Sequence, residues 1–283
     1  MAATAKWLHV KEVRGESVDP KDAAKTIWEK KKLVLGAYKG YEAFTGELSL
    51  SDRGEWAAGE YKNLDDATFN EAVATMRRVT DSGIYPLFED GLTQFDPSSM
   101  PEGSYFLKSP DATQWDGSDF VAKILLTEAW TNEVLLSKPH PHLGAYLGCV
   151  VHDGRIVRLA FPLYVETLYD RIQKLERHGV ERMNADEREK CMRTIGEAVT
   201  HLHSLGYGHN DISAANIMFD QSDDALLIDV GSSTRLGEKI KKGGVAGGWR
   251  GPLFWGQEFN TSSAECDQAC LKYIDEWLSG TQE

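Results

Sequence analysis

One loop constrains the fold of this chain more than any other segment. It reads His-Asn-Asp-Ile-Ser-Ala-Ala-Asn, so that Asp211 stands five residues before Asn216. Asp229 follows thirteen residues after Asn216, in the sequence Ile-Asp-Val-Gly. A predicted helix precedes the loop, and two short predicted strands, 217–219 and 225–228, lie between the loop and Asp229. Such an order can bring three oxygen-bearing side chains to one place in a fold of helices and strands.

These residue types suit the handling of phosphate. Carboxylate and amide oxygens are the ligands that Mg²⁺ prefers, and Mg²⁺ leaves coordination positions for phosphate oxygens. A carboxylate that does not bind the metal can orient a hydroxyl group or accept its proton. Asp and Asn are also common in ordinary turns, so either residue alone would carry no functional meaning. Their spacing, together with the hairpin before Asp229, indicates a phosphotransfer site.

Hydrophobic periodicity predicts the elements around this loop. An Asp-Gly turn at 153–154 joins two apolar runs, 145–151 and 155–164, which is a strong signal for a β-hairpin. A short strand is expected over 104–108. Apolar residues at helical spacing predict helices over 65–80, 119–137, 167–178, 185–205 and 263–278. In the last of these, Cys266 and Cys270 are spaced to share one face as buried thiols.

The acidic composition excludes some classes of partner. The 283 residues carry a net charge of −13, whereas proteins that bind nucleic acid need a surplus of Lys and Arg. We therefore expect no nucleic-acid partner and no docking on an anionic membrane. No segment reaches the roughly 20 apolar residues of a membrane-spanning helix. The four cysteines form no disulfide framework, so we expect a cytoplasmic protein, with the nucleus as the alternative.

The loop and the Ile-Asp-Val-Gly sequence resemble two motifs of protein kinases: the catalytic loop His-Arg-Asp-x-x-x-x-Asn and the metal-binding Asp-Phe-Gly. Segments 139–155 and 201–211 are similar to those of short fungal protein-kinase-domain proteins. The resemblance covers roughly residues 85–278. It implies that Asp211 acts as the base, that Asn216 and Asp229 bind Mg²⁺, and that ATP and Mg are the cofactors.

The resemblance also implies a fold of the α+β class. This is a bilobal protein-kinase-like fold with a small β-rich N-lobe, residues 84–161, and a truncated, mainly helical C-lobe, residues 162–283. The C-lobe would end after the helix that carries Asp267, which matches the Asp with which kinases brace the catalytic loop backbone. Residues 1–83 lie outside the resemblance and would form an N-terminal extension or a small added subdomain of unknown role.

Kinases hold the α- and β-phosphates with a Lys, which a Glu on a helix positions. For the Lys we prefer Lys108, at the end of the predicted strand, to Lys123, which falls inside a predicted helix. For the Glu we prefer Glu128 to Glu133, because Glu128 shares the inward face of its helix with neighbouring leucines.

The same resemblance assigns the contacts with adenine to a hinge that follows the second strand of the predicted hairpin. Its residues are Pro162, Leu163, Tyr164 and Val165. An apolar run of this kind is also what a buried strand requires, and both interpretations can hold together.

The chain departs from the kinase pattern at several places. No Gly-x-Gly-x-x-Gly sequence precedes Lys108, and residues 91–103 are rich in Pro and Ser instead. Asn210 replaces the Arg of the catalytic loop, so activation by a phosphate bound to that Arg is not expected. Val230 replaces the Phe of Asp-Phe-Gly, and Ser213 stands where Ser/Thr kinases usually carry Lys.

Three functions remain open from the sequence. The first is ATP- and Mg-dependent phosphoryl transfer to a protein hydroxyl by a Ser/Thr-type, protein-kinase-like enzyme of full or weak activity. The second is a pseudokinase that acts as a binding scaffold or regulator, which the missing glycine loop and the short C-lobe favour. The third is a small-molecule kinase. The expected partners are ATP and an unidentified protein substrate.

Overall fold

The computed structural model describes residues 6–19, 22–49, 59–62, 66–179, 183–247 and 256–280. The chain divides into two compact units, and each is described by itself. The first unit holds Met1–Asp90, Lys108–Leu126 and Val150–Arg158. The second holds Gly91–Leu107, Thr127–Cys149 and Leu159–Glu283. No helix within the described ranges is both long enough and apolar enough to span a membrane.

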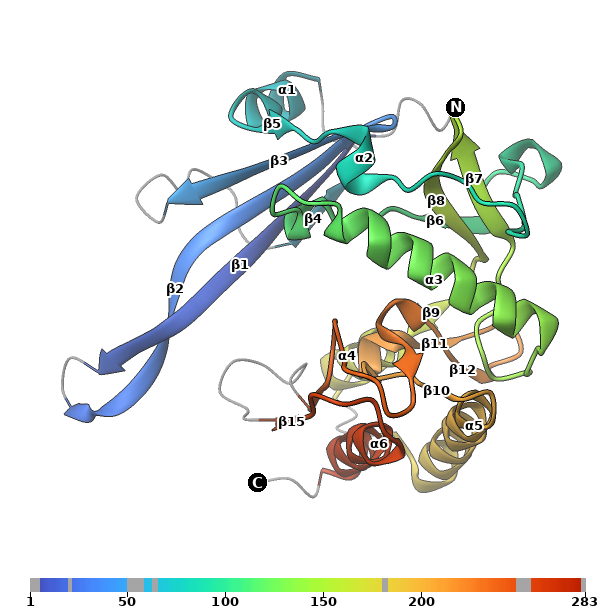
Figure 1. The fold of residues 1–283 in the computed structure, drawn as a ribbon. Helices are drawn as coiled ribbons and strands as arrows, with labels where there is room; N and C mark the ends of the chain where they lie inside the picture. The colour runs from blue at the N-terminus through green and yellow to red at the C-terminus, as the bar shows by residue number, and fades with distance from the viewer. Residues whose placement is uncertain are drawn as a thin grey trace. The chain divides into compact units, whose positions relative to one another are not determined.

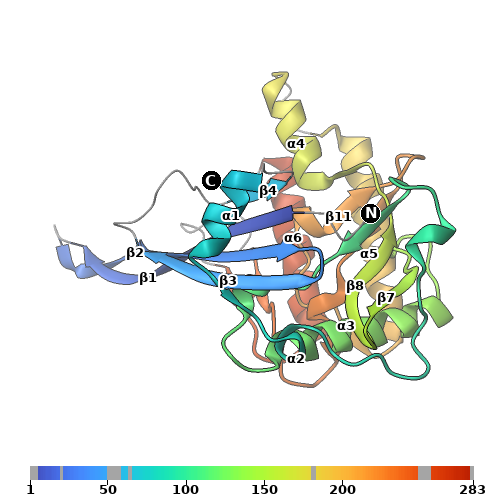
Figure 2. The same cartoon turned by 90° about the horizontal axis from the view of Figure 1, so that it is seen from above.

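A long antiparallel sheet dominates the first unit. Its five strands have the order β4-β1-β2-β3-β5, and β1, β2 and β3 run side by side (Figures 1 and 2). The strands are β1 (Lys6–Asp19), β2 (Asp22–Lys39), β3 (Glu42–Ser49), β4 (Gly59–Lys62) and β5 (Arg77–Arg78). None of these five strands was predicted from the sequence.

Helix α1 (Asp66–Ala74) packs its apolar side against this sheet. Alternate residues of β2 point toward the helix, as the two-residue period of a strand requires. The resulting core contains Leu8, Val10, Leu33, Leu35, Ala37, Phe69 and Ala72. The short helix α2 (Asp81–Ile84) and the 3-10 turn η3 (Ala112–Gln114) complete the regular elements of this region.

The helix predicted over residues 65–80 is therefore wrong at its C-terminal end. It ends at Ala74, and Arg77 and Arg78 pair instead with Thr45 and Phe44 of β3. The helical spacing of the apolar residues continues past Ala74, but backbone pairing at the edge of the sheet decides the conformation there.

The predicted hairpin and the strand before it form a three-stranded sheet of order β6-β8-β7. The strands are β6 (Tyr105–Lys108), β7 (Gly148–His152) and β8 (Arg155–Pro162). Asp153 and Gly154 have φ angles of 49° and 71°, which is the left-handed backbone that a two-residue hairpin turn requires. Helix α3 (Phe120–Ser137) confirms the helix predicted over 119–137.

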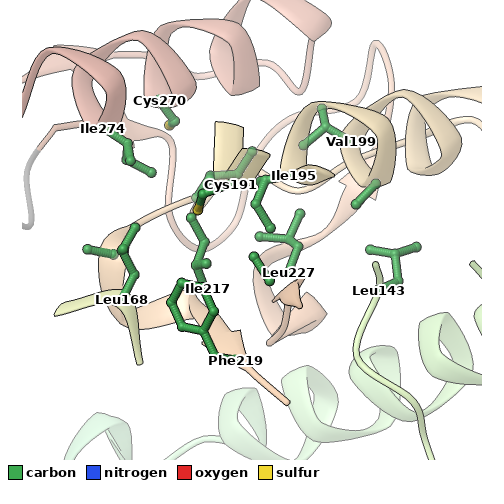
Figure 3. Close-up of a cluster of buried hydrophobic side chains, with 14 of the residues drawn as sticks. Leu143, Leu168, Cys191, Ile195, Val199, Ile217, Phe219, Leu227, Cys270 and Ile274 are labelled. Carbon is green, nitrogen blue, oxygen red and sulfur yellow. The ribbon is translucent and has the colours of Figure 1, made fainter. Parts of the chain in front are cut away.

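The second unit holds most of the helices and a large apolar core. Its elements include β9 (Glu166–Thr167), α4 (Leu168–Arg177), α5 (Ala185–Ser204), β11 (Ile217–Phe219), β12 (Ala225–Leu227) and α6 (Ala264–Ser279). Figure 3 shows side chains from α4, α5, α6 and the β11–β12 hairpin converging on this core. Cys266 and Cys270 are buried free thiols on α6, as expected. A β-rich N-terminal region and a helical C-terminal part confirm the α+β class.

Helix α5 leads the chain toward the loop that carries Asp211 and Asn216. Its start is capped by Asn184, whose side chain accepts a hydrogen bond from the backbone N–H of Glu187. Its end is followed by Gly206, which has a φ of 85°, a conformation that glycine adopts readily. The two residues of β10 (Tyr207–Gly208) come next, and the loop begins at His209.

Candidate active site

Asp211 and Asn216 lie in one loop between β10 and β11, and the loop is closed by its own hydrogen bonds. The Nδ2 of Asn216 donates to the backbone oxygen of Asp211 at 2.8 Å. The backbone oxygen of Asn216 accepts from the N–H of Ile228 at 2.9 Å. Because the amide nitrogen of Asn216 is used inside the loop, its amide oxygen is the side-chain atom suited to a metal ion.

Asp229 follows β12 in an unusual backbone conformation. Its φ and ψ angles are 61° and 74°, in the left-handed region, which non-glycine residues occupy rarely and which is often found at functional sites. One carboxylate oxygen accepts a hydrogen bond of 3.0 Å from the N–H of Gly231. This bond caps the 3-10 turn η5 (Val230–Ser232) and fixes the direction of the carboxylate.

Asp211 is half-buried, and its carboxyl group interacts electrostatically with that of Asp229. Burial is the main cause that raises the pKa of Asp211, and the negative charge of Asp229 raises it further. The basic groups of His209 and Lys242 act in the opposite direction. The hydroxyl of Ser232 lies 3.5 Å from Asp211 Oδ2. Two carboxylates that repel each other in this way favour a bound cation.

Helix α6 holds the backbone of this loop through one buried carboxylate. Asp267 Oδ2 accepts from the backbone N–H of His209, and Oδ1 accepts from that of Asn210, both at 2.8 Å. The Nε2 atom of His203 lies 2.8 Å from Oδ2. Hydrogen bonds to an ionised group are stronger than those between neutral groups. The prediction that Asp267 braces the catalytic loop backbone is confirmed.

Asn210, which stands in the place of the kinase Arg, is buried and tied down. Its side chain donates to the backbone oxygens of Gly208 and Ser232, each at 3.1 Å. Its φ is 64°, a left-handed value that Asn tolerates better than most residues. The side chain therefore joins the loop to the segment after Asp229, and it points inward rather than toward a surface phosphate.

Two glutamates of α3 have different surroundings. Glu128 is 3% exposed, and a Cβ placed on Gly231 would lie 2.8 Å from Glu128 Oε2 and 2.9 Å from Asp229 Oδ1. The carboxylates of Glu128 and Asp229 thus meet at Gly231. Glu133 instead accepts hydrogen bonds from the N–H and hydroxyl of Thr93, at 2.6 and 3.0 Å. This geometry places Glu128, and not Glu133, beside Asp229.

The sequence of this region matches a known family. Residues 121–256 match the family model of the protein kinase domain. The matched residues include Glu128, Asp211, Asn216 and Asp229. This match supports the assignment of residues 121–256 to the protein-kinase-like superfamily.

Two curated kinases are distant relatives. Dual specificity protein kinase pyk3 of Dictyostelium discoideum is 26% identical over 151 residues, which are 49% of this chain and 10% of pyk3. A CTD kinase subunit alpha homolog of Encephalitozoon cuniculi is 28% identical over 99 residues, which are 35% of this chain and 28% of that protein. The chain therefore spans only a small part of either relative.

The two candidate lysines for phosphate binding lie on different elements. Lys108 is the last residue of β6 and is half-buried. Lys123 lies on α3, as its helical periodicity predicted, and its ammonium group is 2.8 Å from Asp119. Both side chains of that ion pair are exposed. Lys123 is thus a surface residue of a helix, whereas Lys108 lies at the end of a strand, as predicted.

The residues predicted to form the hinge connect β8 to β9. The N–H of Leu163 donates to the backbone oxygen of Ser104 at 3.3 Å, and that of Val165 donates to Phe219 at 2.8 Å. The hydroxyl of Tyr164 accepts from the N–H of Ala145 at 2.9 Å. Pro162 ends β8. The backbone of this segment is therefore hydrogen-bonded to two other parts of the second unit, at Ser104 and at Phe219.

The oxygen-bearing side chains at this site suit a Mg²⁺ ion whose other ligands come from the phosphates of a nucleotide. Among the described residues, no group of three or more His, Cys, Asp or Glu side chains is arranged to hold a metal ion. One amide oxygen and one carboxylate, from Asn216 and Asp229, fit the usual Mg²⁺ site, which uses one or two carboxylates plus the phosphates of the nucleotide.

Two residues near Asp211 were not predicted from the sequence. The hydroxyl of Ser232 approaches the carboxylate of Asp211, and the positive charge of Lys242 acts to lower the pKa of Asp211. Both follow Asp229 in a Gly-rich segment, and their positions depend on how that segment returns to the loop. The Gly-Gly pair at 243–244 was the one available signal of a close backbone approach.

Proposed function

We propose that this protein transfers the γ-phosphoryl group of ATP to a hydroxyl group of a protein substrate, in a Mg-dependent reaction. The observation that carries the proposal is the set Asp211, Asn216 and Asp229, in a loop braced by Asp267. The match of residues 121–256 to the protein kinase domain supports it.

We assign the binding of Mg²⁺ to the amide oxygen of Asn216 and the carboxylate of Asp229. When bound, the ion neutralises the charge of the phosphates and orients them. We propose that Lys108 binds the α- and β-phosphates and that Glu128 positions this lysine. We assign adenine to the hinge residues Pro162, Leu163, Tyr164 and Val165.

In the proposed reaction, Asp211 orients the substrate hydroxyl and receives its proton. The hydroxyl oxygen forms a new bond to the γ-phosphorus, and the bond from that phosphorus to the β–γ bridging oxygen breaks. ADP leaves with the electron pair, and the proton passes from Asp211 to solvent. Burial raises the pKa of Asp211, and a carboxylate with a raised pKa is a stronger base toward the proton of the hydroxyl.

A transfer assay with radiolabelled ATP and Mg²⁺ tests the proposal on the full chain, with peptide libraries and the chain itself as acceptors. Asp211→Asn should keep Mg–ATP binding, measured by isothermal titration, and lose transfer. Asp229→Asn should lose both. A folded wild-type chain that neither binds Mg–ATP nor transfers phosphate would refute the proposal. Transfer to hydroxylated metabolites but to no protein would favour a small-molecule kinase.

A regulatory pseudokinase is the alternative, and one observation favours it. The chain before β6 contains the 3-10 turn η2 (Pro97–Ser99) and isolated bridges from Leu87 and Gln94. Residues 85–104, between α2 and β6, form no strand-loop-strand hairpin of the kind that covers nucleotide phosphates in kinases. If Asp211→Asn leaves the biological activity of the folded protein unchanged, the pseudokinase is correct.

The cysteines support a reducing compartment for the proposed activity. All four cysteines are buried free thiols, which suits the cytoplasm or the nucleus. The net charge of −13 suits a protein partner better than a nucleic acid. We therefore propose a cytoplasmic or nuclear protein that acts on a protein substrate.

A further inference from the structure

After Asp229, the chain returns to the catalytic loop at two consecutive glycines. Gly243 and Gly244 both have a φ of 81°. The N–H of Gly244 donates to the backbone oxygen of Asn210 at 2.7 Å. A Cβ on Gly243 would lie 2.5 Å from that same oxygen and 3.3 Å from the Cβ of Asp211. The glycine backbone therefore lies directly against the residue that carries the catalytic carboxylate.

Gly244 is also held on its other side. Its backbone oxygen accepts from the N–H of Phe259 at 2.7 Å, and a Cβ on Gly244 would meet the backbone oxygen of Phe259. The next residues continue this contact as the strand pair β14 (Val245–Ala246) and β15 (Gln257–Glu258). Gly244 is thus enclosed between the catalytic loop and the chain that leads into α6.

Asn210 takes part in several of these hydrogen bonds. Its N–H is bound by Asp267, its side-chain nitrogen by Gly208 and Ser232, and its backbone oxygen by Gly244. A shift of Gly244 would therefore move a residue that is fixed at three other points. Asp211 is the next residue in the chain, so the position of its carboxylate depends on the same contacts.

The sequence of the returning segment adds an independent constraint. From Arg235 to Gly256 the chain contains no Ser, Thr or Tyr. No side chain of this segment can accept a phosphate from an ordinary protein kinase, so a phosphate on it cannot supply the contact that holds the loop.

We propose that Gly243 and Gly244, here named the glycine latch, are positioning residues that hold the catalytic loop in its working geometry without phosphorylation. The inference rests on the proposed function, because it concerns the placement of Asp211. The latch works by backbone hydrogen bonding and close approach, and any side chain at Gly243 must push Asn210 and Asp211 away.

The chain offers a matched control for the latch. Gly237 lies in the same segment and has a φ of 88°, but a Cβ there would meet nothing within 4 Å. Gly237→Ala and Gly243→Ala therefore impose similar backbone strain. Only Gly243→Ala adds a collision with Asn210, so a difference between the two variants reports the latch itself.

The experiment compares the full-length wild type, Gly237→Ala and Gly243→Ala. We expect Gly243→Ala to lower kcat on the order of 10²-fold, because a displacement of about 1 Å in a catalytic group has such an effect. The Kd for Mg–ADP should stay within about twofold of the wild type, because the latch contacts the loop and not the hinge. The amide of Gly244, measured by hydrogen exchange, should exchange faster in Gly243→Ala than in Gly237→Ala.

Equal kcat and equal exchange in the two variants would overturn the latch. The exchange measurement keeps this outcome separate from a failure of the proposed function, because it needs no catalytic activity. If Gly243→Ala does not fold, the wild type decides: the Gly244 amide must be protected as strongly as the amide of Asn210. Exchange at the rate of an open loop would overturn the proposal.

Discussion

Asp267 Oδ1 lies 2.8 Å from the backbone nitrogen of Asn210, although 57 residues separate the two in sequence. Asp267 is fully buried, and its other oxygen accepts from the N–H of His209. A carboxylate can only accept hydrogen bonds, so it matches two adjacent N–H groups in a way that an amide cannot.

Asp267→Asn should therefore be strongly destabilising. The new NH₂ group faces an N–H donor, which loses its acceptor inside the protein, and we expect a loss of about 3 kcal/mol in the free energy of unfolding. Urea denaturation provides the measurement. The control is Asp275→Asn on the same helix, where the carboxylate is 48% exposed and 3.5 Å from Arg188. That variant should lose less than about 1 kcal/mol, and equal losses would contradict the bracing role.

Asp211→Asn should make the metal-free protein more stable at neutral pH. The pKa of Asp211 is raised above its ordinary value of 3.8, mainly by burial. Its contribution to stability is therefore fully present below pH 3.8 and is lost as pH rises through the folded value. The variant removes this loss, so its advantage in Tm should grow as pH rises from 4 to 7. Thermal scans in EDTA measure it, and an advantage that is constant with pH would show that the charge is not the cause.

Glu128→Gln and Glu133→Gln should have different effects. The carboxylate of Glu128 meets that of Asp229 at Gly231, whereas Glu133 binds Thr93. We expect Glu128→Gln to lower kcat/KM for ATP by about 10-fold or more, as loss of a positioning charge does. Glu133→Gln should leave kcat/KM nearly unchanged but speed hydrogen exchange at Thr93. The reverse pattern would transfer the role to Glu133.

Lys108→Met should weaken nucleotide binding, whereas Lys123→Met should not. Lys123 is an exposed partner of Asp119, and an ion pair of this type contributes at most about 0.5 kcal/mol to the helix. Isothermal titration with Mg–ATP compares the two variants with the wild type. Weaker binding in Lys123→Met alone would show that our choice between the two lysines is wrong.

Four of the helices and the β7–β8 hairpin could be predicted largely from local sequence. The helices near 119–137, 167–178, 185–205 and 263–278 each carry apolar residues at helical spacing, and the Asp153-Gly154 turn identifies its hairpin without further information. The role of Asp267 followed from a family motif. In each case the decisive residues are close together in sequence or belong to a motif with fixed spacing.

The sheet of the first unit and the glycine latch could not be predicted in this way. β1 pairs with β4, and β4 lies far along the chain. The end of the helix predicted over 65–80 is likewise decided by pairing with β3. Gly243 carries no side chain to form a pattern, and its importance arises from the carbonyl group that it approaches. Such pairings depend on chain topology, which periodicity does not encode.

The bond between Asp267 and Asn210 also sets an order of events during synthesis. The ribosome makes Asn210 57 residues before Asp267, which at about 5–20 residues per second is a delay of roughly 3–11 seconds. Throughout that interval the nascent loop is complete in sequence but lacks the acceptor that shapes it. The loop therefore cannot take up this geometry until α6 has emerged.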